Sequence, residues 1–275
     1  MSAAPPDLTC AVIALVGGEA GLRCADALAE ETGFAPAMID RSAPGGATVP
    51  GRRRAALAQI GGGLVALVED TTLVAPGWAA AVRAGLADPA VAAVWGPVRI
   101  APGLAARYRA LGRMEYGRFH GEAPLPQSPP GNCMAFRRAA LDAALPPGSG
   151  FAEHQVAAAL RQAGWSIAFA PGAASSYAVA DHHGARLATR FGHGRLYAAT
   201  SRPPGDIAGR IAGAVKALLV PLVLTARALG HARAAAPAQV WLAEAPHVAL
   251  MALAWGAGEF TGHLFGKGDS ERTWR

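Results

Sequence analysis

The stretch Gly63-Leu-Val-Ala-Leu-Val-Glu-Asp-Thr-Thr-Leu-Val-Ala-Pro-Gly-Trp78 decides the fold. Its first part is a short apolar run rich in β-forming residues, which predicts a buried strand over 63–68. The run ends on Glu69 and Asp70, a Pro-Gly turn follows, and a helix is expected over 78–86. Carboxylates at the C-terminal end of a buried strand lie where open α/β sheets bind ligands.

The acid pair, Glu69 with Asp70, has two interpretations. A pair of carboxylates at this edge can hold a divalent metal against the phosphates of a nucleotide. The alternative is that both acids only end the strand and cap the next element. The residues alone leave both interpretations open.

Apolar runs and turn signals extend this pattern along the chain. Strands are expected at 8–16, 36–40, 63–68, 91–100 and 165–170, and helices at 20–31, 52–60, 78–86, 103–121, 135–144, 153–163 and 184–200. The repeated strand-helix-strand order predicts an α/β fold with a parallel sheet and helices on both faces.

Composition narrows the class of protein. The chain has 275 residues, 52% hydrophobic and 16% charged, and a net charge of +6 that comes almost entirely from Arg. Arg suits phosphate contacts, and a basic balance favours an anionic membrane surface, a nucleotide or a nucleic acid. Nothing in the chain resembles a nucleic-acid-binding module, so no nucleic-acid partner is expected.

Targeting signals and cysteine usage indicate the compartment. The N-terminus lacks a basic segment followed by an apolar one, so no signal peptide is expected. The three cysteines are widely spaced and fit no disulfide framework, which favours a reducing cytosol.

The C-terminal part differs in composition. A Pro-Gly-rich stretch at 202–205 predicts a boundary between a domain at 1–201 and an apolar helical region at 202–275. Two apolar helical segments are expected there, at 207–229 and 246–265. The uncharged core of each is only about ten residues, short of the roughly twenty that span a bilayer. The residues favour ordinary core helices over interfacial ones, although Arg210, Lys216 and Arg227 flank the first segment as interfacial residues do.

Six motifs follow one another in an order typical of a known family. They are Met38-Ile-Asp-Arg-Ser42, Arg53 with Gly62, Glu69-Asp70, Gly131-Asn-Cys-Met-Ala-Phe-Arg-Arg138, Gly150-Phe-Ala-Glu-His154 and Arg190-Phe-Gly-His-Gly-Arg195. In this order the chain resembles the family-two glycosyltransferases with a GT-A fold, in particular bacterial membrane-associated members. The resemblance implies a Rossmann-like GT-A fold, with a mixed, mainly parallel sheet flanked by helices and a C-terminal apolar helical region.

The resemblance also implies donor-binding residues. The donor would be a UDP- or GDP-linked sugar held with a divalent metal, Mg²⁺ or Mn²⁺. Its contacts would come from Asp40 at the nucleoside, from Arg53, from Glu69 and Asp70 at the sugar-nucleotide, with Asp70 as metal ligand, and from Arg190 and Arg195 at the pyrophosphate.

Acceptor-side roles follow from the same resemblance. Asn132 would line the acceptor site, and Glu153 or His154 would be the general base that an inverting sugar transfer needs. Metal and Arg side chains would stabilise the charge on the departing diphosphate. Several positions depart from the family pattern. Thr71 and Thr72 follow Asp70 where a further acid is usual, His154 replaces the usual Asp, and Arg54 replaces the usual Asn.

Three functional hypotheses remain. The first is a glycosyltransferase, of hexosyltransferase type, acting at the cytoplasmic face of the cell membrane on a lipid-linked or envelope-glycan acceptor; the tail Gly256-Ala-Gly-Glu-Phe-Thr-Gly262 resembles the family's membrane-associated segments. The second is a catalytically degenerate GT-A-like binding protein that acts through a membrane partner. The third, a nucleotidyltransferase, is less favoured because the loop after the first strand has glycines but no Lys.

Overall fold

The computed structural model describes residues 8–121, 129–145, 151–179, 183–201 and 206–270. The chain forms two compact units. The first consists of residues 1–99 and 119–179, and the second of residues 100–118 and 180–275. The residues of each unit pack mainly against one another.

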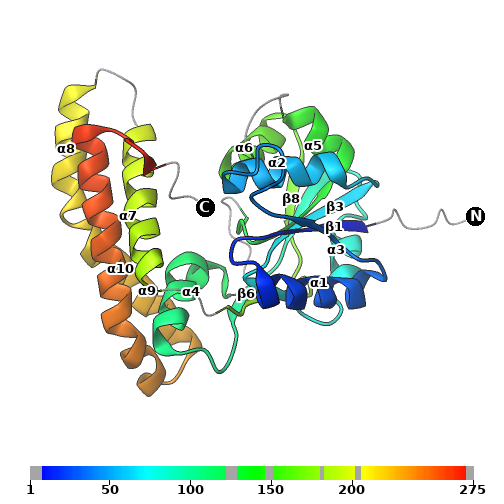
Figure 1. Ribbon diagram of the computed structural model, residues 1–275, viewed down its shortest axis with the longest axis horizontal. Coiled ribbons are helices and arrows are strands. Elements are labelled where there is room, and N and C mark those ends of the chain that lie inside the picture. Colours follow the sequence, from blue (N-terminus) through cyan, green and yellow to red (C-terminus); the bar gives the residue numbers. More distant parts are fainter. Residues whose placement is uncertain (1–7, 122–128, 146–150, 180–182, 202–205, 271–275) are drawn as a thin grey trace, which may run out of the picture. The chain divides into compact units, whose positions relative to one another are not determined.

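The first unit is a layered α/β structure (Figure 1). Its elements are β1 (Leu8–Ile13), α1 (Gly18–Thr32), β2 (Ala37–Ile39), α2 (Val49–Gln59), β3 (Leu64–Glu69), β4 (Thr72–Val74), α3 (Trp78–Gly85), β5 (Val91–Trp95), β6 (Val98–Ile100), β7 (Cys133–Arg137), α5 (Arg138–Ala144), α6 (Glu153–Gln162), β8 (Ser166–Phe169) and β9 (Ser175–Tyr177). The 3-10 turn Gly117–Phe119 spans the sequence boundary between the units. Figure 1 shows α2, α5 and α6 on one face of the central sheet and α1 and α3 on the other.

The central sheet has six strands in the order β2-β1-β3-β7-β5-β8. The β1–β2, β1–β3 and β5–β8 pairs are parallel, whereas β7 runs antiparallel to both of its neighbours. The predicted mixed, mainly parallel α/β sheet flanked by helices is therefore confirmed. The expectation of one helix over 135–144 is wrong in its first part, because Cys133–Arg137 fills the gap between β3 and β5 as a strand.

A second sheet of three strands, β4-β9-β6, lies beside the first. The single strand expected over 91–100 is divided between the two sheets, as β5 and β6. Gly96 and Pro97 separate them: a side chain at Gly96 would collide with the Ala173 backbone, 2.0 Å from its carbonyl oxygen. Pro97 has no N–H to continue a ladder. The sheet change therefore has a local cause in the sequence.

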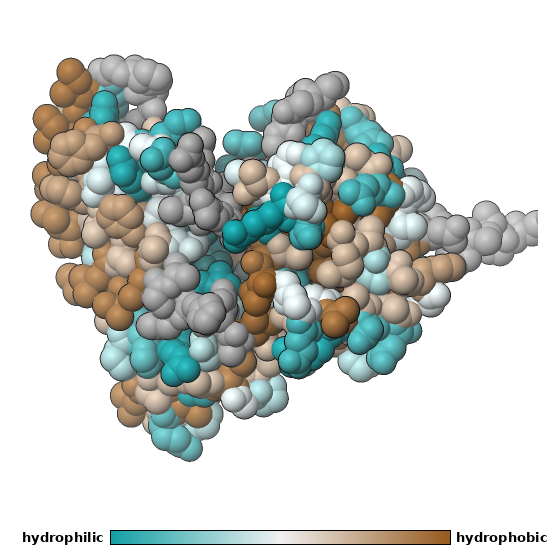
Figure 2. All heavy atoms as spheres, in the orientation of Figure 1, coloured by the Kyte–Doolittle hydropathy of each residue, from teal (hydrophilic) through white to brown (hydrophobic). Residues whose placement is uncertain are grey.

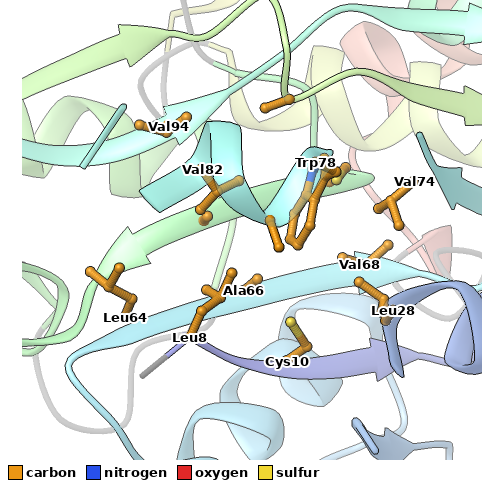
Figure 3. Close-up of a cluster of buried hydrophobic side chains, with 14 of the residues drawn as sticks. Leu8, Cys10, Leu28, Leu64, Ala66, Val68, Val74, Trp78, Val82 and Val94 are labelled. Carbon is orange, nitrogen blue, oxygen red and sulfur yellow. The ribbon is translucent and has the colours of Figure 1, made fainter. Parts of the chain in front are cut away.

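The core between the central sheet and α1 with α3 is largely aliphatic. Figure 3 shows Leu8, Leu64, Val68 and Val82 in this cluster together with Trp78, which is 1% exposed. The three cysteines, Cys10, Cys24 and Cys133, are free and lie in this same core. Burial raises the pKa of the Cys10 and Cys133 thiols to about 12, so both are protonated and inert at neutral pH.

The second unit is helical. Its helices are α4 (Ala106–Tyr116), α7 (His183–Thr200), α8 (Ile207–Ala217), α9 (Val220–Ala235) and α10 (Ala238–Phe265). The single segment expected over 207–229 is two helices, because Pro221 sits in the first turn of α9, where its missing N–H costs nothing. The segment expected from 246 begins earlier, at Ala238, and Pro246 lies within it. The stretch 202–205, predicted as a boundary, lies outside the described residues.

Helices α7 and α10 pack backbone to backbone. A Cβ added at Gly258 would lie 2.1 Å from the Phe191 carbonyl oxygen, and one at Gly262 would lie 2.2 Å from that of Arg195. On the facing helix, Gly194 approaches the Trp255 carbonyl in the same way. Three glycines therefore set the spacing of this helix pair.

A buried ion cluster ties α10 to α4. Glu244 is 0% exposed and accepts from Arg109 at 2.8 Å and from Arg113 at 3.4 Å. Because α4 and α7 pack with α10, the compact units do not follow the linear boundary at residue 201. The functional division into 1–201 and 202–275 stays a prediction.

We predict that Gly258→Ala destabilises the chain by about 1–3 kcal/mol, because the added methyl group meets backbone that cannot yield. The matched control is Gly230→Ala in α9, where an added Cβ meets nothing within 4 Å. Removing a helical glycine there should be neutral or stabilise by about 0.5–1 kcal/mol. Thermal and denaturant unfolding of the whole chain measures both, and equal stability of the two variants would contradict the packing described.

Candidate functional site

The carboxyl ends of three parallel strands bring polar residues to one edge of the central sheet. In register, Ile13 at the end of β1 pairs with Ile39 of β2 and with Glu69 of β3. Asp40 and Asp70 follow directly after β2 and β3. The structure therefore places both acids at the edge that the sequence predicts for ligand binding.

Asp70 fixes the loop between β1 and α1. It is 1% exposed, and its Oδ2 accepts from the backbone N–H groups of Val16 at 2.9 Å and Gly17 at 2.6 Å. Gly17 has φ of 77°, a conformation that glycine adopts without strain. The other oxygen, Oδ1, is buried and has no hydrogen-bond partner among the described residues. Oδ2 therefore holds the loop, whereas Oδ1 makes no hydrogen bond to the described residues.

Arg53 of α2 is the centre of a buried ion cluster. Its side chain is 3% exposed and donates to Glu69 Oε1 at 2.9 Å and to Glu153 Oε2 at 2.8 Å. It also donates to the carbonyl oxygens of Gly131, at 3.0 Å, and Phe151, at 3.5 Å. Arg53 and Glu69, predicted to bind the donor, and Glu153, predicted to be the base, therefore form one cluster.

The cluster sets the charge of its members. Burial raises the pKa of the Glu153 carboxyl, but the Arg53 guanidinium and the backbone N–H at the start of α6 outweigh burial, so the pKa lies below its ordinary value. Burial lowers the pKa of Arg53, and the two carboxylates reverse this and raise it. Glu153 is therefore ionised at neutral pH and held as an ion pair.

Arg52 is a site residue that the sequence analysis missed. A basic run such as 52–54 usually forms a solvated helix face, yet Arg52 is 0% exposed. It donates to the carbonyl oxygens of Ala14, after β1, and Gly46, the latter at 3.0 Å. Its Nη2 has no hydrogen-bond partner in the described part of the chain. The nearby Gly/Pro-rich loop at 42–51 was the available signal, since such a loop offers carbonyl oxygens to a neighbouring cation.

Asp40 is exposed and forms a local turn. Its Oδ1 accepts from the backbone N–H of Ser42 at 2.8 Å and from the Ser42 hydroxyl at 2.6 Å. These hydrogen bonds hold the pKa of Asp40 below its ordinary value. The carboxylate is thus ionised and open to solvent, and its predicted contact with a nucleoside stays a prediction.

The predicted acceptor-side residues differ in burial. Asn132 is 0% exposed, and its Nδ2 donates to Thr72 Oγ1 at 2.9 Å, so it links β7 to the start of β4. His154 is exposed in the first turn of α6, next to Glu153. Thr71, at the position of the missing acid, is 2% exposed and its hydroxyl has no partner among the described residues.

Arg190 and Arg195 belong to the second unit. Arg190 is 6% exposed, lies 3.3 Å from Glu115 and stacks over the Trp255 ring at 5.2 Å. Arg195 donates to the Gly266 carbonyl at 2.8 Å, at the C-terminal end of α10. Both cations therefore have partners within their own unit, and their predicted contact with a pyrophosphate stays a prediction.

Comparison with known proteins adds one finding. No protein-family model and no curated protein matches the chain. Among solved structures, it is similar to the mannosyltransferase PcManGT from Pyrobaculum calidifontis in complex with GDP-mannose and Mn²⁺, with 21% sequence identity and a TM-score of 0.50 over 94% of this chain and 88% of that one. The chain shares the fold of a glycosyltransferase.

The edge fits a divalent metal through one protein ligand. Among the described residues, no three His, Cys, Asp or Glu side chains come together to hold a metal ion. The unpaired Oδ1 of Asp70 is a suitable oxygen ligand. Mg²⁺ and Mn²⁺ at nucleotide sites commonly use one or two carboxylates, with phosphates and water completing the shell. Glu69 has its Oε1 in an ion pair with Arg53, 2.9 Å away, so Asp70 is the better metal ligand of the pair.

We predict that Arg53→Gln lowers the free energy of unfolding by about 3–5 kcal/mol, since it leaves Glu69 and Glu153 without their shared cation. Arg161→Gln, on the exposed side of α6, is the matched control and should change it by less than about 0.5 kcal/mol. Denaturant unfolding at neutral pH measures both variants.

The ion pair also predicts an acid-dependent loss of stability. A carboxyl whose pKa is lower in the folded chain stabilises the fold above its ordinary value of 4.5, and this stabilisation is lost as the pH falls below that value. In Glu153→Gln the side chain no longer titrates, so stability should fall less between about pH 6 and about pH 3 than in the wild type. If the variant and the wild type lost equal stability over this pH range, the Arg53–Glu153 pair would contribute nothing to the free energy of unfolding.

Proposed function

We propose that the chain is a glycosyltransferase that transfers a sugar from a nucleotide-sugar to an acceptor hydroxyl. The observation that carries the proposal is Asp70: a buried carboxylate with one unpaired oxygen, at the carboxyl edge of β3. The fold around it is shared with a mannosyltransferase that binds GDP-mannose and Mn²⁺. This supports a donor linked to UDP or GDP and a requirement for Mn²⁺ or Mg²⁺.

Each predicted donor-binding residue would have its own role. Asp70 would hold the metal, which when bound neutralises charge on the diphosphate as it departs. Arg52 has a buried guanidinium with an unpaired Nη2 at the end of β1 and would contact an anionic or carbonyl group of the donor. Asp40 is exposed at the end of β2 and would meet the nucleoside. Arg190 and Arg195 would contact the pyrophosphate.

An inverting reaction needs one base. Glu153 is ionised, Arg53 holds its Oε2, and its Oε1 would take the proton of the acceptor hydroxyl. The acceptor oxygen then bonds to the anomeric carbon while the bond from that carbon to the phosphate oxygen breaks, and the nucleoside diphosphate leaves. His154, one residue on and exposed, is the second candidate because an imidazole accepts a proton near neutral pH. Asn132 would line the acceptor side through its unpaired Oδ1.

We propose that the reaction takes place at the cytoplasmic face of a bacterial cell membrane. A hexose would be transferred to a lipid-linked or envelope-glycan acceptor. By length and composition α10 could cross a membrane, and α8 with α9 passes the same test as a pair bent by 52°. Nucleotide-sugars are made in the cytosol, where the donor edge would face. Recovery of the whole chain in the soluble fraction without detergent would contradict this location.

A second candidate function is a catalytically degenerate relative that binds a nucleotide and a membrane partner. Two observations favour it. The edge offers one carboxylate oxygen for a metal where Thr71 replaces a further acid, and the base candidate Glu153 is tied to Arg53.

We predict Mn²⁺-dependent binding of either GDP or UDP, measured by calorimetric titration of the whole chain. Asp70→Asn should abolish the metal dependence while the chain stays folded, because the amide oxygen still accepts from Val16 and Gly17. Thr71→Asp should strengthen metal-dependent binding by about tenfold, since it supplies a second carboxylate.

The paired variants separate structure from binding. Loss of both folding and binding in Asp70→Asn would assign Asp70 to the fold alone. No binding of either nucleotide with any metal, in the wild type or in Thr71→Asp, would overturn the donor site.

We predict that the wild type slowly hydrolyses its preferred donor, GDP-mannose or a UDP-sugar, with release of the diphosphate. Glu153→Gln should slow this release by about 10²–10⁴-fold if Glu153 is the base, and His154→Gln should leave it unchanged. Nucleotide binding without release of diphosphate from any donor would favour the degenerate relative.

A further inference from the structure

The exposed side of α8 and α9 is a row of large aliphatic side chains. Figure 2 shows hydrophobic side chains gathered along the left edge of the helical unit. The row, called here the aliphatic row, consists of seven residues that are each between 46% and 70% exposed: Ile207, Ile211, Val215, Leu218, Leu219, Leu222 and Val223. A contiguous apolar surface of this kind marks an interaction site rather than ordinary surface.

The spacing shows that the aliphatic row is built into the helices. Positions 207, 211 and 215 are four residues apart, which places them on one face of α8. Leu218 and Leu219 lie at the break before α9, and Leu222 and Val223 lie in its first turn. The opposite face of α8 and α9 carries small buried residues, including Ala214, Ala217, Ala228 and Ala232. These helices therefore turn their small side toward the rest of the unit and their large aliphatic side outward.

The exposed charged residues of α8 and α9 are basic. Residues 207–268 contain two acids, Glu244 and Glu259, and both are buried, at 0% and 9% exposure. Glu244 is paired with Arg109 and Arg113, and Glu259 accepts from Trp255. The cations on the same helices are exposed on α8 and α9: Lys216, Arg227 and Arg233. The surface thus presents aliphatic groups and positive charge, and Asp206, the acid next to the row, caps α8 by accepting from the Gly209 N–H at 2.8 Å.

We propose that α8 and α9 lie in the plane of a bilayer with anionic headgroups. The aliphatic row enters the boundary between headgroups and acyl chains, and Lys216, Arg227 and Arg233 extend to lipid phosphates. This goes beyond the membrane location given above by naming the attaching surface, its orientation and the lipid class. It does not depend on sugar transfer.

Helix length argues for lying in the plane rather than spanning. α8 has 11 residues and α9 has 16, which at 1.5 Å per residue gives about 17 Å and 24 Å, less than the roughly 30 Å of a hydrocarbon core. The bend of 52° between them prevents one straight span.

Composition argues for lipid rather than a protein partner. Protein interfaces are enriched in aromatic residues and Met. Residues 207–235 contain no Trp, Tyr, Phe or Met. An exposed row made only of Ile, Leu and Val, flanked by Lys and Arg, matches an interfacial helix better than a docking site for protein.

The test is co-sedimentation of the whole chain with preformed vesicles of phosphatidylcholine alone or mixed with phosphatidylglycerol. The wild type should bind the mixed vesicles more tightly. Ile211→Gln with Leu218→Gln should weaken binding by at least about tenfold, because two aliphatic groups no longer enter the bilayer. Lys216→Gln with Arg227→Gln should weaken binding only to the anionic vesicles, by about 25-fold, since each cation near such a surface contributes about fivefold.

The matched control removes equally exposed apolar groups from the other unit. Leu22 and Phe34 are 64% and 65% exposed, and Leu22→Gln with Phe34→Gln should bind vesicles as the wild type does. Equal weakening in this control, or no vesicle binding by the wild type, would overturn the proposal. So would a wild-type dimer that Ile211→Gln with Leu218→Gln converts to monomer, because a second copy would then cover the row.

A depth measurement separates lying from spanning. The native cysteines are buried, so a fluorophore can be attached at Val215→Cys or at Lys216→Cys. On vesicles, a water-soluble quencher should reach the label at 216 but not the one at 215; shielding of both would show that the segment spans. Titration of the row variants with GDP and Mn²⁺ should match the wild type, so that failure of the donor site and failure of the membrane face are distinguished.

Discussion

The pairing of Arg53 with two carboxylates is the constraint on which the carboxyl edge of the first unit depends. A guanidinium that is 3% exposed is costly without anionic partners, and removal of either partner leaves a buried charge. Glu69 comes from the end of β3 and Glu153 from the start of α6, while the carbonyl oxygens of Gly131 and Phe151 complete the set. One side chain therefore positions the end of a central strand, the segment that leads into β7 and the first turn of a helix. It also explains why Glu69 and Asp70, although adjacent, do not act as a pair: Glu69 is held toward Arg53, and Asp70 toward the β1–α1 loop.

The two units differ in which side chains they bury. In the first unit large aliphatic side chains fill the space between the sheet and its helices, and only four large hydrophobic residues are exposed among those described. In the second unit glycines and alanines fill the contacts of α7, α8 and α9 with α10, and thirteen large hydrophobic residues of its described part face outward. Such an inversion is unfavourable in water, because exposed apolar surface has no compensation there. It would become favourable against acyl chains, as proposed for α8 and α9. The buried Glu244 of this unit is paired within it, with Arg109 and Arg113.

Local patterns in the sequence were sufficient for most strands and for the acids at the sheet edge, because a buried strand ending on carboxylates is a local signal. They failed where the determinant is distant. Cys133–Arg137 is a strand only because β3 and β5 lie on either side of it; a run of Cys, Met, Ala and Phe has no periodicity that excludes a helix. The burial of Arg52 depends on the carbonyl oxygen of Ala14, 38 residues away. The shared pairing of Glu69 and Glu153 with Arg53 could not be predicted. The two acids are 84 positions apart, and neither segment carries a local sequence signal for the ion cluster. The positions of Asp40, Arg53 and Asp70 at or near one edge were predictable, but the partner of each was not.

Charge balance at this edge connects the cluster to metal dependence. The buried and half-buried ionic groups there are Arg52, Arg53, Glu69, Asp70 and Glu153, two cations and three carboxylates, so the set carries a net charge of −1. At the exposed margin Asp40 adds a negative charge and Arg41, near Arg52, adds a positive one, so the net charge stays at −1. A nucleoside diphosphate brings at least two more negative charges, and like charges at close range repel strongly where little water screens them. Under the proposed function, a divalent cation that arrives with the diphosphate would remove this repulsion, and the unpaired oxygen of Asp70 would be its protein ligand. The same reasoning applies to Thr71. A further acid in its place would bind the metal more tightly, and it would also add negative charge to the edge. With Thr71, metal and nucleotide are expected to bind together or not at all.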